Sequence, residues 1–159
     1  MKSSTKWHSA RWEAVADNGF TLLELLAVVS IIAILAAISV TLYGNVLNKA
    51  RETAAISYLT SINKSEELYK QDAGGGYTAD FDVLETTGVL TNGPGGPVRI
   101  EKDYTFTLTA GTNGDGTPAF TVNANPTNNN ASMKWFFINE TGIIRYAIGG
   151  AAGPGSQTL

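Results

Sequence analysis

Glu24 is the residue whose position suggests chemistry most directly. It ends the segment 19–24, Gly-Phe-Thr-Leu-Leu-Glu, and no charged residue follows it before Lys49. The apolar stretch 25–48 is long enough for a membrane-spanning helix, which needs about 20 residues. A carboxylate at the start of such a helix would cost about 3 kcal/mol in lipid, which makes Glu24 a functional hypothesis by default. The alternative interpretation is a surface glutamate that is favoured by the dipole at a helix N-terminus.

Few other side chains in the sequence offer catalytic or metal chemistry. The single histidine is His8 and cysteine is absent, so the chain has no Cys–His pair, thiolate metal site or disulfide. We therefore predict no catalytic residues, no enzymatic activity and no cofactor. Asp80, Asp82 and Asp115 lie in expected loops and are the candidates for calcium ligands. The turn around Asp115 lacks the ligand set and the terminal glutamate of an EF-hand loop, so we predict no metal site.

The N-terminal residues 1–19 differ from an ordinary secretory signal. Such a signal has its apolar core before the cleavage site, whereas here the polar residues come first and the apolar stretch follows Gly19. Lys2, Lys6 and Arg11 favour an N-terminus that stays in the cytoplasm. The formal net charge of the chain is −3, which argues against a general nucleic-acid-binding surface.

The remaining sequence predicts one α+β domain within 159 residues. A helix is expected from about residue 21 to residue 72, and Gly74-Gly75-Gly76 ends it. Its second half is amphipathic, with an apolar stripe at helical spacing that includes Ala55, Leu59 and Ile62, so it must pack against a sheet. A short helical turn is expected at 81–85. Strands are expected at 104–109, 119–123, 134–139 and 143–148, followed by an extended or mobile tail at 149–159.

The N-terminal motif resembles that of the type IV pilin and type II secretion pseudopilin superfamily. Gly19, Phe20, Thr21, Leu22, Leu23 and Glu24 match the family motif at every position. The resemblance implies that a prepilin peptidase cuts between Gly19 and Phe20 and that the new amino group of Phe20 is methylated. It also implies that Glu24 pairs with the Phe20 amine of a neighbouring subunit during assembly.

This resemblance implies a type IV pilin-like fold, in which one long N-terminal helix packs by its second half on about four antiparallel strands. The expected parts are a leader (1–19), a transmembrane and filament-core helix (20–48), the amphipathic half of the same helix (49–73) and a β-rich globular region (74–159).

The function predicted from the resemblance is that of a major pilin, which forms a homo-oligomeric helical filament. The precursor would be a single-pass inner-membrane protein, and its partners would be the peptidase and the inner-membrane assembly platform. The filament would be an extracellular pilus or a periplasmic pseudopilus, and no nucleic-acid partner is expected. The alternatives are a major pseudopilin of type II secretion and a minor pilin that acts as a binding or adhesion subunit.

Overall fold

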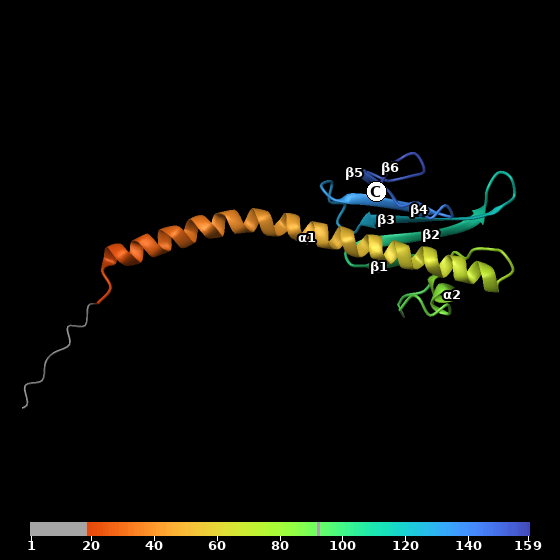
Figure 1. Cartoon of the computed structure of the whole chain (residues 1–159), viewed down its shortest axis with the longest axis horizontal. Helices are drawn as coiled ribbons and strands as arrows, with labels where there is room; N and C mark the ends of the chain where they lie inside the picture. Colours follow the sequence, from red (N-terminus) through yellow and green to blue (C-terminus); the bar gives the residue numbers. More distant parts are fainter. Residues whose placement is uncertain (1–18, 92) are drawn as a thin grey trace, which may run out of the picture. The chain divides into compact units, whose positions relative to one another are not determined.

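The computed structural model describes residues 19–91 and 93–159, and it confirms the predicted α+β class. A long helix precedes an antiparallel sheet of six strands (Figure 1). The elements are α1 (Leu22–Asp72), α2 (Phe81–Glu85), β1 (Val98–Glu101), β2 (Tyr104–Thr112), β3 (Pro118–Pro126), β4 (Lys134–Asn139), β5 (Arg145–Ile148) and β6 (Gln157–Thr158). The predictions for residues 1–18, which form most of the predicted leader, lie outside the described residues.

The described chain divides into two compact units, and the boundary falls after Thr41, inside α1. In the first unit every side chain from residue 22 to residue 39 is exposed, and most of these side chains are apolar. The hydroxyls of Ser30 and Ser39 donate to the carbonyls of Leu26 (2.7 Å) and Leu35 (2.8 Å). The helix therefore satisfies its own polar groups, and its apolar surface on all sides suits an environment of lipid or of other helices.

In the second unit the sheet packs on the amphipathic half of α1, as the sequence predicts. Ala55, Leu59 and Ile62 lie on one side of the helix and are fully buried. Every second residue of the central strands faces them, because side chains alternate between the two faces of a strand. The strand residues of this core are Tyr104, Phe106, Leu108, Phe120, Val122, Ala124, Phe136 and Ile138. The core therefore lies between α1 and one face of the sheet, and Phe81 and Leu84 of α2 belong to it as well.

The sheet has two more strands than the approximately four that the sequence predicts. The strands follow one another in the order β1 to β6, and each pairs antiparallel with the next. The four predicted strands correspond to β2, β3, β4 and β5. Strand β1 was missed because only four residues form it and two of them are charged. Strand β6 has only two residues, and it brings the end of the extended segment 149–159 back to the edge of the sheet beside β5.

The glycine run after α1 ends the helix as predicted. Gly74 and Gly75 have φ values of 78° and 109°, a region in which L side chains are strained. The Gly75 N–H donates to the Lys70 carbonyl (2.9 Å), which satisfies one of the last carbonyls of the helix. The chain then turns toward α2, where the Asp80 carboxylate accepts from the Asp82 N–H (2.9 Å) and caps the short helix.

Candidate functional site

Glu24 and Thr21 form a reciprocal set of hydrogen bonds at the start of α1. The Glu24 N–H donates to Thr21 Oγ1 (3.1 Å), while Thr21 N–H and the Thr21 hydroxyl donate to Glu24 Oε2 (3.0 and 2.9 Å). This arrangement is a capping box, in which the side chains of a threonine N-cap and of a glutamate three residues later each accept a hydrogen bond from the backbone N–H of the other residue. Within the single chain, the Glu24 carboxylate therefore already accepts two hydrogen bonds, both from Thr21.

The role of Thr21 as a partner of Glu24 was not predicted from the sequence. The spacing Thr-x-x-Glu just before an apolar run is the sequence signature of a capping box and would have identified the pair. The consequence is that Glu24 has a structural role in the single chain in addition to any role between chains.

The proposed cleavage site lies immediately before this box and is accessible. The Phe20 side chain is 85% exposed, and a Cβ at Gly19 would meet no atom within 4 Å. Both residues precede the helix, so their backbone is not held in helical hydrogen bonds. A peptidase could therefore reach the bond between them. A cut at this bond would create the new amino group at Phe20, which precedes Glu24 in the sequence by about the number of residues in one helical turn.

The apolar surface of α1 from residue 22 to residue 39 has no cover within the described chain. Large side chains along it remain about half exposed or more, for example Ile31 (59%), Ile34 (62%) and Leu35 (58%). By length and composition, α1 is able to cross a membrane. Exposed apolar surface of this extent requires lipid or other protein, because water contact is unfavourable in proportion to its area. The site thus combines an accessible peptide bond, a carboxylate and an apolar helix that must be surrounded by lipid or by other protein.

Comparisons with known proteins bear directly on this segment. The family model described as "prokaryotic N-terminal methylation motif" matches residues 16–40. The N-terminal segment of the chain therefore carries this motif. The chain is 38% identical over 72 residues to the type IV wide pilus major component PilA4 of Thermus thermophilus, a match that covers 45% of this chain and 54% of that protein.

A second relative of the chain is prepilin peptidase-dependent protein D of Escherichia coli. The two are 42% identical over 64 residues, which is 40% of this chain and 44% of that protein. The chain thus spans about half the length of each of these two relatives. No solved structure matches it significantly. The comparisons therefore bear on the N-terminal segment, which resembles a pilus component and a peptidase-dependent protein.

Two of the three calcium candidates, Asp80 and Asp115, lie in separate loops and cap backbone N–H groups, while the third, Asp82, lies in α2. Asp80 Oδ1 accepts from the N–H groups of Asp82 and Gly96, both at 2.9 Å. Asp115 Oδ1 accepts from the hydroxyl (2.6 Å) and N–H (3.0 Å) of Thr117, and these bonds lower the pKa of Asp115. Among the residues that the structure describes, no three His, Asp or Glu side chains come together in a way that could hold a metal ion.

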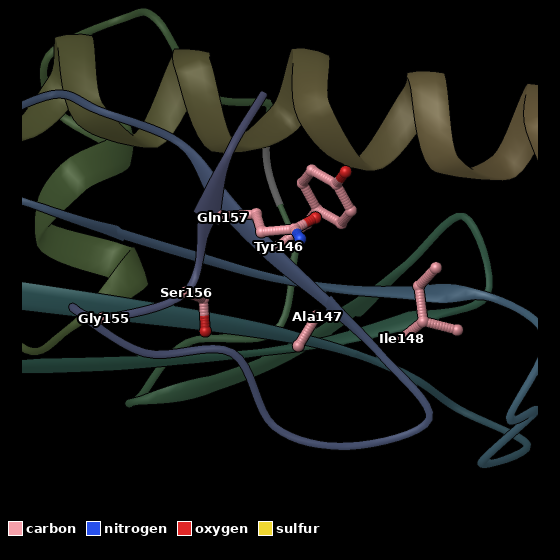
Figure 2. A pocket seen from close by; sticks show the side chains of 6 residues that line it. All are labelled: Tyr146, Ala147, Ile148, Gly155, Ser156 and Gln157. Atoms are coloured by element: carbon pink, nitrogen blue, oxygen red, sulfur yellow. The ribbon is translucent and has the colours of Figure 1, made fainter.

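A shallow pocket of about 360 Å³ lies at the edge of the sheet, between β5 and the C-terminal segment (Figure 2). Its lining residues are Tyr146, Ala147, Ile148, Gly155, Ser156 and Gln157. Tyr146 is the only ionisable side chain among them, and none of them is a carboxylate or a cation. We assign no chemistry to this pocket, and the candidate site remains the start of α1.

The capping box predicts a local effect of replacing Thr21. Thr21→Val removes the hydroxyl and should weaken the helix start by about 1 kcal/mol, because loss of a cap leaves helix N–H groups without partners. The amide hydrogen of Glu24 should then exchange about fivefold faster in the detergent-solubilised chain. Thr21→Ser keeps the hydroxyl and is the matched control. Equal exchange in all three proteins would show that the box does not hold the helix start.

Proposed function

We propose that this chain is the major structural subunit of a type IV pilus-like filament. The observation that carries the proposal is the uncovered apolar half of α1, which begins with Glu24, the only charged residue between 20 and 48. Lipid would cover this surface before assembly, and the helices of other copies would cover it afterwards. The similarity to a protein named as a wide pilus major component supports this choice.

In the proposed pathway a prepilin peptidase cuts between Gly19 and Phe20, removes the leader 1–19 and exposes an amino group that is then methylated. The Glu24 carboxylate of one subunit pairs with the Phe20 amine of its neighbour. An ion pair in an apolar environment favours the one stagger in which both charges are satisfied, so its main effect is on register. Residues 20–48 form the filament core, and the globular region 74–159 faces outward on the amphipathic half 49–73.

The proposed precursor is a single-pass inner-membrane protein that an assembly platform extracts into an extracellular filament. Its partners are copies of itself, the peptidase and the platform, and nucleic acid is not among them. We infer that the chain is not an enzyme, because without residues 1–19 it has neither histidine nor cysteine. The same N-terminal geometry would serve a major pseudopilin of type II secretion or a minor pilin, and the location and abundance of the filament separate these alternatives.

Intact mass and N-terminal sequencing of the protein from its native cells test the processing step. We expect a chain that begins at Phe20 and carries one extra methyl group on its amine. A Gly19→Leu variant is the control and should keep its leader, because a side chain obstructs close approach of the peptidase to the backbone. A wild-type chain that begins at Met1, or that is cut elsewhere, would contradict the proposal.

A further inference from the structure

The connection between α1 and α2 is tied down by side chains from the last turns of α1. We call residues 73–80 the strap. The Thr78 N–H donates to Glu66 Oε2 (3.1 Å), and the Tyr77 hydroxyl donates to Glu67 Oε1 (2.8 Å). Lys70 Nζ donates to the same hydroxyl (2.8 Å) and lies 4.6 Å from the centre of the Tyr77 ring. Three polar side chains from the last turns of α1 therefore hold two neighbouring residues of the strap.

Of these three anchors, Glu66 has the environment that is least favourable for a charged side chain. It is fully buried, whereas Glu67 and Lys70 are partly exposed. Its Oε1 atom has no hydrogen-bond partner within the described residues, and neither does the neighbouring hydroxyl of Ser65. A buried carboxylate with one N–H bond is poorly solvated, so the neutral form fits this position better than the ionised form.

The charged groups around Glu66 do not compensate for this burial. Burial is the main cause that raises the pKa of Glu66 to about 7; the Thr78 N–H opposes this rise, and the charge of Glu67 contributes to it. Lys70 is the nearby cation, but its ammonium donates to the Tyr77 hydroxyl, and this bond raises the pKa of Lys70. The charges of Glu67 and of Glu140, which lies in the turn after β4, also raise this pKa. Burial therefore favours the neutral form of Glu66 up to about neutral pH.

We propose that the strap is a pH-sensitive element of the fold, which is docked on α1 while Glu66 is neutral and opens when Glu66 ionises. Opening lets water reach the carboxylate, and the flexible Gly74-Gly75-Gly76 segment supplies the freedom to move. Opening separates the Tyr77 ring from the Phe120 ring, whose centres lie 4.8 Å apart in the docked state. The rest of the unit stays folded, because Ala55, Leu59 and Ile62 remain packed on the sheet. This inference concerns the globular unit and does not depend on the proposed filament function.

The direction of the effect follows from proton linkage. The docked state has a Glu66 pKa of about 7, and the open state has the ordinary value of about 4.5. A raised pKa contributes stability that is complete below pH 4.5 and is lost as the pH rises to 7. Because one proton is involved, the docked population relative to the open one should fall about tenfold per pH unit between pH 5 and pH 7 and level off above that.

Amide hydrogen exchange on the full chain in detergent micelles tests the proposal. Protection factors of residues 74–78, corrected for the intrinsic pH dependence of exchange, should fall about tenfold per pH unit between pH 5 and pH 7. Glu66→Gln is neutral at every pH and keeps an acceptor for the Thr78 N–H, so its protection should not change with pH. Glu67→Gln is the matched control on the neighbouring residue and should retain the wild-type pH dependence.

A carboxyl carbon NMR titration of Glu66 in the wild-type chain gives a second measurement that needs no variant. We expect a midpoint near 7, and a midpoint near 4.5 would overturn the proposal. Strap protection that is independent of pH in the wild type, or pH dependence that survives in Glu66→Gln, would overturn it equally.

Discussion

Replacing Glu24 with glutamine is expected to abolish filaments while cleavage after Gly19 continues. Glutamine has nearly the same shape and can occupy the same position of a capping box, so the helix start should persist. The carboxylate charge is lost, and the Phe20 amine of the neighbouring subunit is left unpaired in an apolar environment. Removing one partner of a buried ion pair costs about 3 kcal/mol or more, which is roughly a hundredfold in the equilibrium for each added subunit.

Two further variants separate the role of Glu24 within one chain from its role between chains. Glu24→Ala removes both the charge and the hydrogen bonds to Thr21, and it should also give no filaments. Thr21→Val removes the threonine hydroxyl from the box but keeps the carboxylate, so filaments should form if the charge is what matters. The three proteins thus distinguish a register ion pair from a simple helix cap, the interpretation that the hydrogen bonds in the single chain also permit.

Filament number by electron microscopy and leader removal by mass spectrometry are the two measurements for this series. Cleavage should be complete in all three variants, because the peptidase acts on the exposed segment before the helix. Wild-type filament numbers in Glu24→Gln would refute the proposed ion pair. Loss of filaments in Thr21→Val as well as in Glu24→Gln would indicate that the box itself is required.

Replacing Arg99 with methionine is expected to destabilise the globular unit by about 3–5 kcal/mol. The Arg99 guanidinium is fully buried, and its Nη2 lies 2.7 Å from Glu85 Oε1, whose side chain is only 15% exposed. It also donates to the Pro94 carbonyl (2.9 Å) and to the Tyr58 hydroxyl (3.2 Å). Without the arginine, the Glu85 carboxylate and these oxygens lose a buried donor, and burying them unpaired is costly.

The effect should be large because one side chain connects four parts of the fold. Arg99 belongs to β1, Tyr58 to α1, Glu85 to α2 and Pro94 to the loop between α2 and β1. The guanidinium also lies 4.8 Å from the centre of the buried Phe81 ring, which adds a cation–π contact. Loss of Arg99 should therefore loosen α2 and the loop together.

Arg51 provides a matched control, because it also makes a 2.7 Å ion pair, with Asp103. Those two side chains are 30% and 62% exposed, so Arg51→Met should cost less than about 1 kcal/mol. Denaturant unfolding of the full chain in detergent, followed by near-UV circular dichroism, measures both values. If the two methionine variants unfold at the same denaturant concentration, the buried pair does not stabilise the fold. A double variant, Arg99→Met with Glu85→Leu, should recover part of the loss, because it removes the unpaired carboxylate.

The sequence by itself determined the helices, the central strands and the candidate site. Apolar residues without a charge after Glu24 predicted the start of α1, and Gly74 and Gly75 marked its end. Alternation of apolar residues predicted β2 to β5, and the spacing of Ala55, Leu59 and Ile62 predicted the face of α1 that meets the sheet. These features are readable because helical and strand periodicities are local properties of the chain. The N-terminal motif is also a contiguous segment, so it needs no tertiary structure to be found.

Only the tertiary structure decided which polar residues are buried and what they hold. Arg99 sits in a short strand with Glu101, and nothing local distinguishes it from a solvent-exposed arginine, yet pairing with β2 turns it toward the helix side of the sheet. Glu66 occupies an ordinary helical position and is buried because the strap returns over it. Strand β6 exists only through its pairing with β5. In each case the deciding contact joins residues that are distant in sequence or held by a loop, and local sequence carries no signal for it.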